Sequence, residues 1–244
     1  LQLGGHALFL SSNDIQLGRG ETIADTARVL SRYNDGIMIR TFAHRKVEDL
    51  ARCADIPVIN GLTDSYHPCQ ALADYFTIFE RVKDIAKVKL TYIGDGNNVA
   101  NSLLMGAAIL GTDITIACPK KFEPEMQVVE KAYKLAANSY SKIVITNDID
   151  KAVEGADYIY TDVWVSMGQE KDASKKKKIF EKFKVDMDLI KKTGTDTRVL
   201  HCLPAHRGEE ITDEVMDGRH SIVFDQAENR LHCQKAVLCA LMGR

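Results

Sequence analysis

The sequence lacks a strong excess of either charge. Its 32 Lys and Arg residues nearly balance 34 Asp and Glu residues, so the formal net charge of the 244-residue chain is only −2. A protein that holds a nucleic-acid backbone needs a broad basic field, which this composition does not supply, so nucleic acid is not expected as a partner. The one basic run, KDASKKKKIFEKFK at 171–184, is interleaved with acidic and aromatic residues, and we expect it to form a solvated loop and helix face.

The sequence also lacks metal-binding cysteine motifs and long apolar segments. The six cysteines form no C-x-x-C pair and no Cys/His cluster with the spacing of a structural zinc site, which favours reduced thiols in a cytoplasmic protein. No apolar run is long enough to span a bilayer, and the opening LQLGGHALFLSS lacks the basic stretch and the cleavage site of a signal peptide. The sequence therefore predicts a cytoplasmic location without a membrane partner.

Short apolar runs alternate with helix-like stretches along the whole chain. The expected strands are HALFL, GIMIR, IPVIN, KLTYI, DITIA, KIVIT, DYIY and TRVLH, and the stretches between them have helical spacing. This alternation is typical of βαβ units, so we predict an α/β fold of parallel sheets covered by helices. With 45% hydrophobic residues the chain can build two such domains, and the charged connector at 81–88, after a long amphipathic helix, is the expected boundary.

Polar residues follow several of the expected strands, where open parallel sheets bind ligands. Arg40 follows GIMI, and a guanidinium there suits a phosphate or carboxylate, or else a salt bridge between domains. His67 and Gln70 of HPCQ lie one helical turn apart and could both donate hydrogen bonds to a carbonyl oxygen. A helix cap and a surface amide are the ordinary alternative.

The stretch IGDGNN at 93–98 allows a tight turn between a strand and a helix. It lacks the third glycine of a dinucleotide-binding turn, and the next strand ends in Cys118 and Pro119 instead of an acidic residue, which argues against an NAD-dependent dehydrogenase. Asn97 and Asn98 could bind a polar substrate or only cap the helix.

Three later stretches could also carry chemistry. Asp162 in TDVWVSMGQE could bind a substrate ammonium group. Cys202 in HCLPAHRGEE is a candidate thiolate or hydrogen-bond partner, or else a buried inert thiol. AENR places Arg230 at the expected start of the last helix, where an arginine and a helix N-terminus suit a phosphate, although an ordinary helix start is the alternative.

Together these stretches resemble the ornithine carbamoyltransferases of the aspartate/ornithine carbamoyltransferase family. HPCQ (67–70), SMG (166–168) and HCLP (201–204) occur in the family's order and spacing, and DIQLGRGE, MIRTF, IGDGNN and AENR agree with it. The resemblance covers essentially the whole chain. It implies a carbamoyl-phosphate-binding domain at 1–82, an ornithine-binding domain at 83–226, and a C-terminal helix at 227–244 that packs back on the first domain.

The resemblance also implies two groups of site residues. Those that would bind carbamoyl phosphate are Gln16, Arg40, His67, Gln70 and Arg230, and those that would bind ornithine are Asn98, Asp162, Ser166, Met167, Cys202 and Leu203. Arg40 and His67 would stabilise the oxyanion, and Asp162 with Cys202 would position the amine and ease the loss of its proton. No metal and no cofactor is implied. The implied assembly is a homotrimer or a higher assembly of trimers, in which Gln16 serves a neighbouring subunit's site.

The implied reaction transfers the carbamoyl group of carbamoyl phosphate to the side-chain amine of L-ornithine, giving L-citrulline and phosphate. One family motif, the phosphate-binding Ser-Thr-Arg-Thr, is absent from residues 1–244, and the chain has no initial Met. We therefore expect the N-terminal part of the first domain to be missing from this chain. The alternative is a non-catalytic carbamoyltransferase-like binding protein with an incomplete phosphate site.

Overall fold

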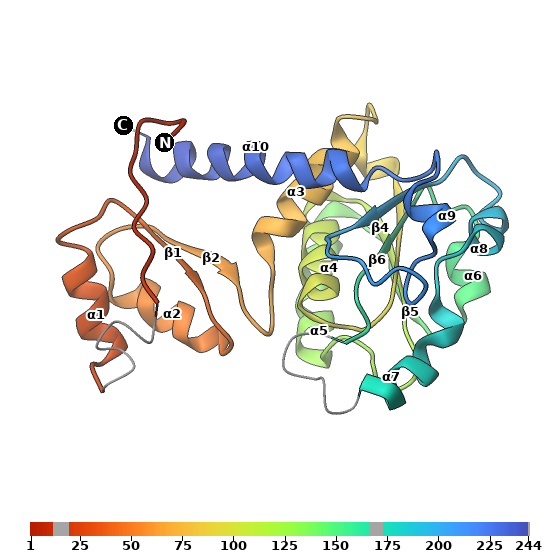
Figure 1. The fold of residues 1–244 in the computed structure, drawn as a ribbon, viewed down its shortest axis with the longest axis horizontal. Coiled ribbons are helices and arrows are strands. Elements are labelled where there is room, and N and C mark those ends of the chain that lie inside the picture. Colours follow the sequence, from red (N-terminus) through yellow and green to blue (C-terminus); the bar gives the residue numbers. More distant parts are fainter. Residues whose placement is uncertain (12–19, 166–172, 244) are drawn as a thin grey trace.

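The computed structural model describes residues 1–11, 20–165 and 173–243 of the chain. A small N-terminal part contains α1 (Ile23–Leu30), β1 (Ile37–Arg40), α2 (His44–Cys53) and β2 (Val58–Leu62). The two strands pair in parallel, with Ile37 opposite Val58. α3 (Pro68–Phe79) and the long α10 (Val223–Met242) connect this part to the larger remainder of the molecule (Figure 1).

The larger part is built on one parallel sheet with the order β5-β4-β3-β6-β7. Its strands are β3 (Lys89–Ile93), β4 (Asp113–Ala117), β5 (Ile143–Thr146), β6 (Tyr158–Thr161) and β7 (Arg198–His201). Its helices are η2 (Ile85–Lys87), α4 (Asn98–Leu110), α5 (Met126–Ser139), α6 (Ile149–Val153), α7 (Ala173–Phe180), η4 (Glu181–Phe183), α8 (Met187–Lys192) and α9 (Asp213–Met216). The predicted fold class of parallel sheets covered by helices is confirmed.

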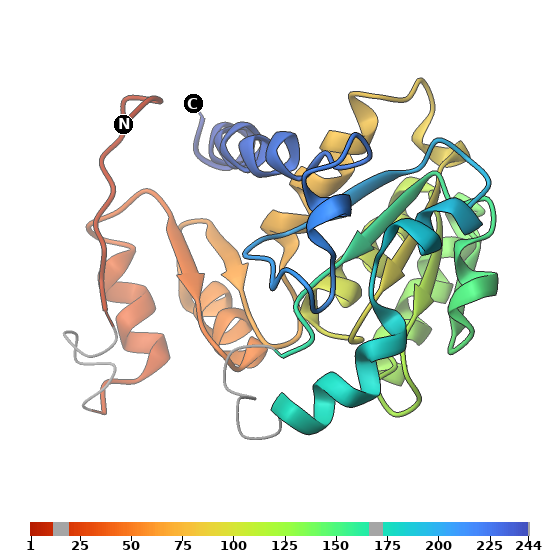
Figure 2. The same cartoon turned by 45° about the vertical axis from the view of Figure 1, so that its right-hand side comes forward.

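Helices lie on both faces of this sheet (Figure 2), and buried apolar side chains fill the space between them and the strands. On one face, Leu90 and Tyr92 of β3 pack with residues of α3, α4 and α5. On the other, Ile159 of β6 and Val199 of β7 pack with residues of α6, α7, α8 and α9. Strands buried on both sides need nearly continuous apolar runs, which is why the sequence indicated them so clearly.

Two expectations about elements were wrong. Residues 6–10 (HALFL) form no strand, and Leu8 and Phe9 are 74% and 93% exposed. The last helix begins at Val223 and not near Arg230, because the apolar pair after Ser221 starts a helix that continues through the polar stretch. Arg230 thus lies about two turns inside α10, so a phosphate site at the N-terminus of that helix cannot include it.

The strand order reverses beside β3, and this is where the site is positioned. β4 and β5 extend the sheet on one side of β3, whereas β6 and β7 lie on its other side. The carboxyl ends of β3 and β6 are adjacent, with Ile93 opposite Thr161. Ligands of open α/β sheets bind at such a switch point. Among the described helices, none is both long enough and apolar enough to span a membrane.

Candidate active site

The turn after β3 places Asn97 and Asn98 at the switch point. Asn97 caps α4, with its Oδ1 accepting from the backbone of Val99 at 2.9 Å, and its Nδ2 donates to Asp162 Oδ2 at 2.8 Å. Asn98 reaches in the other direction, donating from Nδ2 to the carbonyl of Thr63 at 2.7 Å. The asparagines therefore join the end of β6 to the segment that follows β2. This bond occupies one hydrogen of the Asn98 amide, and the other has no partner among the described residues and could serve a ligand.

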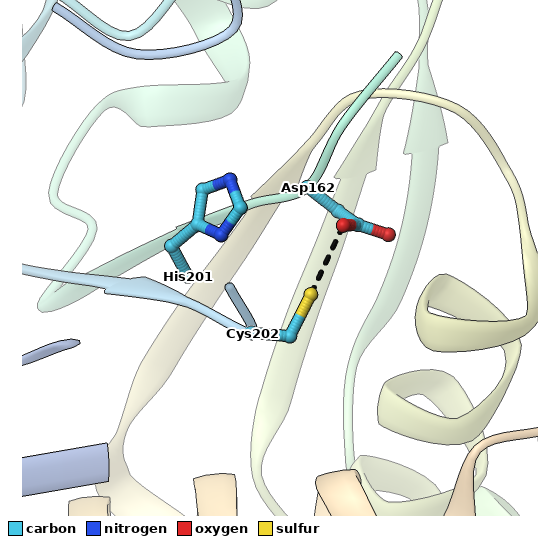
Figure 3. Close-up of side chains that lie close together, drawn as sticks. All are labelled: Asp162, His201 and Cys202. Atoms are coloured by element: carbon cyan, nitrogen blue, oxygen red, sulfur yellow. Dashed lines mark hydrogen bonds between the residues drawn. The ribbon is translucent and has the colours of Figure 1, made fainter. Parts of the chain in front are cut away.

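Asp162 and Cys202 point toward each other from the ends of the neighbouring strands β6 and β7 (Figure 3). The thiol of Cys202 donates to Asp162 Oδ1 over 3.0 Å, and the backbone N–H of Val163 donates to the same oxygen at 2.8 Å. Burial and the neighbouring Asp162 carboxylate raise the pKa of the Cys202 thiol well above its ordinary value. Cys202 is thus a protonated thiol that donates a hydrogen bond, which argues against the thiolate interpretation.

His201 and Glu210, from the same HCLPAHRGEE stretch, shape the loop. The Nε2 atom of His201 lies 3.1 Å from Glu210 Oε1, and Leu203 donates its backbone N–H to His201 Nδ1 at 2.8 Å. Both side chains are completely buried. The ligand atoms of Asp162, His201 and Cys202 lie within 4.8 Å of one another, but both ring nitrogens of His201 are already engaged, which disfavours a metal site there.

His67 immediately precedes α3 and lies beside two arginines. Its backbone N–H donates to Ser102 Oγ at 2.7 Å, which fixes the start of α3 against α4. Its Nδ1 atom is buried and has no hydrogen-bond partner among the described residues. Burial lowers the pKa of His67 to about 4, and the charges of Arg230 and Arg40 lower it as well. The imidazole is therefore neutral at pH 7 and has an uncommitted nitrogen for a ligand.

Gln70 and Arg230 are in direct contact across α3 and α10. Arg230 Nη1 donates to Gln70 Oε1 at 2.5 Å, and Gln70 Nε2 donates to Asp74 Oδ1 at 2.8 Å. Gln226 donates to the same carboxyl oxygen at 2.6 Å. Neither Asp74 nor Gln226 stands out in the sequence, because each is an ordinary helix residue and the two are 152 positions apart.

The structure thus brings Arg40, His67, Gln70 and Arg230 together, and joins Asp162 to Cys202. Leu203 is partly buried against the apolar cluster on one face of the sheet, with a backbone φ of 57°. Three predicted site residues, Gln16, Ser166 and Met167, lie outside the described residues.

Sequence reasoning missed a buried ion pair beside the IGDGNN turn. Lys176 Nζ donates to Asp95 Oδ2 at 2.5 Å, and the two residues are 7% and 9% exposed. The prediction of a solvated lysine run was therefore wrong at Lys176. Its ammonium also lies 5.5 Å from the ring centroid of Phe122 and 5.6 Å from that of Phe180, a cation–π arrangement that stabilises a buried lysine.

Two family models match this chain. The Asp/Orn binding domain of aspartate/ornithine carbamoyltransferase matches residues 86–241, which is more than half of the chain, and the carbamoyl-P binding domain matches residues 1–80. The chain belongs to the aspartate/ornithine carbamoyltransferase family. The family resemblance recognised in the sequence motifs is thereby confirmed.

Individual carbamoyltransferases are similar over nearly the whole chain. Ornithine carbamoyltransferase of Pyrococcus horikoshii is 57% identical over 241 residues, which are 99% of this chain and 76% of that protein. The solved structure of ornithine carbamoyltransferase from Pyrococcus furiosus, also 57% identical, superposes with a TM-score of 0.95 over 99% of this chain and 77% of the other. A mitochondrial ornithine carbamoyltransferase from Coccidioides immitis, at 35% identity, has a TM-score of 0.89 over 100% of this chain and 78% of the other.

Proposed function

We propose that this carbamoyltransferase transfers the carbamoyl group of carbamoyl phosphate to the side-chain amine of L-ornithine, giving L-citrulline and phosphate. One observation carries the proposal: a cationic and amide group, Arg230 on Gln70 beside the neutral His67, is joined by hydrogen bonds through Asp74 and Gln226 to the end of β7, where the Cys202 thiol and the Asp162 carboxylate form a second group. The first group suits an anion that carries a carbonyl, and the second suits an ammonium or amine. The names of the relatives, all ornithine carbamoyltransferases, support the same substrates.

In the proposed reaction the neutral side-chain amine of ornithine attacks the carbamoyl carbon. A new N–C bond forms, the C–O bond to phosphate breaks, and the proton lost by the amine leaves on the phosphate. Arg40 and Arg230 offset the charge of the departing phosphate, and His67 donates to the carbamoyl oxygen. Asp162 and the Cys202 thiol hold the amine, and holding both substrates in one place supplies much of the acceleration.

The remaining site residues are proposed from the family resemblance. Asn98, Ser166, Met167 and Leu203 would hold ornithine, and Gln16 would contribute to the carbamoyl phosphate site of a neighbouring subunit. The uncommitted amide hydrogen of Asn98 supports its role, because the carboxylate of an amino acid is an acceptor.

We also propose a division into domains at 1–82 and 83–226 with a returning helix at 227–244, and a homotrimer in the cytoplasm. Light scattering of the purified protein tests the trimer, and a monomer at all concentrations contradicts it.

The deciding experiment is citrulline formation from carbamoyl phosphate and ornithine, with aspartate and putrescine assayed in parallel. Turnover with ornithine alone supports the proposal. Turnover only with another amine overturns the substrate assignment, and no turnover with any amine favours a binding protein without activity.

Asp162→Asn keeps the shape of the side chain and removes the charge that we propose to hold the amine. A hydrogen bond to a charged group is worth about 1.5–3 kcal/mol, so kcat/KM for ornithine should fall by roughly 10- to 100-fold. Asp157→Asn is the matched control, because Asp157 precedes the same strand at its opposite end. Equal losses in both variants would contradict the assignment of Asp162.

A further inference from the structure

Asp74 is a completely buried carboxyl group on α3 that the proposed reaction does not use. It is 0% exposed, and its Oδ1 accepts from Gln70 Nε2 at 2.8 Å and from Gln226 Nε2 at 2.6 Å. Burial raises the pKa of Asp74 to about 7, although the hydrogen bonds from Gln70 and Gln226 lower it. Burying a carboxyl group costs free energy even when it is hydrogen-bonded, so an aliphatic residue would stabilise this position more simply.

The amide of Gln70 is held at both ends. Arg230 donates to its oxygen at 2.5 Å while its nitrogen donates to Asp74. A guanidinium only donates, and Asp74 Oδ1 accepts whether or not the other carboxyl oxygen is protonated. Turning the amide by 180° would set its NH₂ against the donors of Arg230 and its oxygen against the carboxyl oxygen. Only the observed orientation satisfies both partners.

Gln226 prevents Asp74 from turning away from Gln70. Its Nε2 donates to the carboxyl group, and its Oε1 accepts from the backbone N–H of His201 at 2.9 Å. The chain of hydrogen bonds therefore runs from the end of β7 through α10 to α3. Asp74 is fixed from two directions, which makes it a rigid support for the Gln70 amide.

The fixed orientation has a chemical consequence for the substrate. The Gln70 oxygen has two lone pairs, of which Arg230 occupies one, so the other can accept from an NH₂ group. Carbamoyl phosphate carries such a group on its carbonyl carbon, whereas acetyl phosphate, the simplest stable acyl phosphate, carries a methyl group in the same place. A methyl group in that place cannot donate to the second lone pair of the Gln70 oxygen. If the Gln70 amide were turned by 180°, its own NH₂ group would face the NH₂ group of carbamoyl phosphate and repel it.

We infer that Asp74 is a positioning residue that fixes the Gln70 amide with its oxygen available to the substrate, so that the site selects carbamoyl phosphate over acyl phosphates without an amine. This inference rests on the proposed function. It assigns substrate discrimination to a side chain that does not itself touch the substrate.

The test compares the affinities of phosphonoacetamide and acetonylphosphonate, which differ only in NH₂ against CH₃, by isothermal titration calorimetry. The wild-type protein should prefer phosphonoacetamide by roughly 2- to 12-fold, the value of one hydrogen bond. Asp74→Leu, which cannot accept, should reduce the preference to nearly 1. Asp74→Asn retains an accepting oxygen and should keep the preference within about twofold of wild type. An unchanged preference in Asp74→Leu overturns the inference.

Thr77→Val is the matched control. Thr77 lies one turn further along α3 and accepts from Asn229 of α10 at 3.0 Å, so the variant loses a buried contact between the same helices without affecting Gln70. The Thr77→Val variant should keep the wild-type preference for phosphonoacetamide. If this variant also loses the preference, the effect of Asp74→Leu reflects general packing between the two helices. Asp74→Val, which is smaller and likewise cannot accept, replaces Asp74→Leu if the latter does not fold.

Citrulline formation separates this inference from the proposed function. A wild-type protein that forms citrulline, combined with an unchanged preference in Asp74→Leu, refutes only the positioning role. A wild-type protein that binds neither phosphonate and forms no citrulline refutes the proposed function, and the positioning role with it.

Discussion

His67 and Cys202 of the candidate active site both keep their uncharged forms at neutral pH, and in both cases burial is the main cause. His67 is surrounded by cationic arginines, and Cys202 donates to a carboxylate. A neutral imidazole and a protonated thiol can each donate a hydrogen bond without carrying a charge. His67 and Cys202 therefore offer hydrogen bonds to the substrates, whereas the charges of the site come from Arg40, Arg230 and Asp162.

The low pKa of His67 can be observed directly. With a pKa of about 4 in the folded protein, the ring should stay neutral from pH 5.5 to 8.5, and its Cε1 resonance should not shift over that range. The Cε1 signal that disappears in the His67→Gln variant is the one that belongs to His67. Because His67 does not titrate in this range, the pH dependence of kcat/KM for carbamoyl phosphate should have the same shape in wild type and in this variant. A midpoint above pH 6 would show that carbonyl polarisation begins from an imidazolium.

The raised pKa of Cys202 predicts low reactivity. Because the thiolate is the reactive form, iodoacetamide at pH 7.5 should alkylate Cys202 at least about tenfold more slowly than the exposed Cys239, as measured by peptide mass spectrometry. The same comparison in denaturant, where all six cysteines are accessible, is the control. Equal rates in the folded protein would show that Cys202 is a thiolate.

Among the elements, α3 and α4 pack unusually closely, and this contact positions His67. A Cβ atom on Gly106 of α4 would lie 2.3 Å from Cε2 of Tyr75 on α3, whose hydroxyl donates to the Leu103 carbonyl at 2.5 Å. The helices can therefore approach only because residue 106 has no side chain.

Gly106→Ala should destabilise the protein, although alanine favours helix. Overpacking a buried contact costs about 1–3 kcal/mol, and the gain in helix propensity offsets up to about 1 kcal/mol. The urea midpoint should fall correspondingly. Gly5→Ala, at a glycine with no atom within 4 Å of the added carbon, should leave the midpoint unchanged. A stabilised Gly106→Ala protein would show that the two helices can separate at little cost.

The sequence predicted correctly those strands whose own run of apolar residues is enough to place them in a sheet. KLTYI and TRVLH became strands because continuous apolar runs are buried on the faces of a sheet. HALFL has the same pattern and forms no strand, since nothing in the described chain pairs with it. Lys176 was misjudged because only the folded structure brings Asp95, 81 positions away, to its ammonium.

The candidate site was predictable to a similar extent. The family motifs gave His67, Gln70, Cys202 and Arg230, since each motif is a short contiguous stretch. Asp74 and Gln226 have no motif of their own, and their role depends on contacts between distant helices that no local pattern encodes.

For the whole molecule, the buried Asp74 predicts a pH dependence of stability. Its pKa is about 7 when folded against an ordinary value of 3.8, so between pH 4 and pH 7 the folded protein holds a proton that the unfolded chain has released. This contribution makes the free energy of unfolding fall as the pH rises through that window. Asp74→Asn has no carboxyl group to titrate. Its free energy of unfolding should therefore rise relative to that of wild type by on the order of 4 kcal/mol between pH 4 and pH 8.

Denaturant unfolding of both proteins at pH 5, 6, 7 and 8 measures the difference. Comparison with the variant is necessary, because the lowered pKa of His67 makes stability rise with pH over part of the same range. A difference that does not change with pH would mean that Asp74 is already ionised in the folded protein at pH 5.

The contact between α3 and α10 also determines when the site can form during synthesis. Gln70 and Arg230 are separated by 160 positions, and Asp74 and Gln226 by 152. Every strand of both sheets leaves the ribosome before α10 does, so α3 must emerge with its polar groups unpaired. Contacts of such sequence separation form late in folding. The nascent chain should therefore acquire both sheets before it can bind carbamoyl phosphate, and that binding should begin only once residue 230 has emerged.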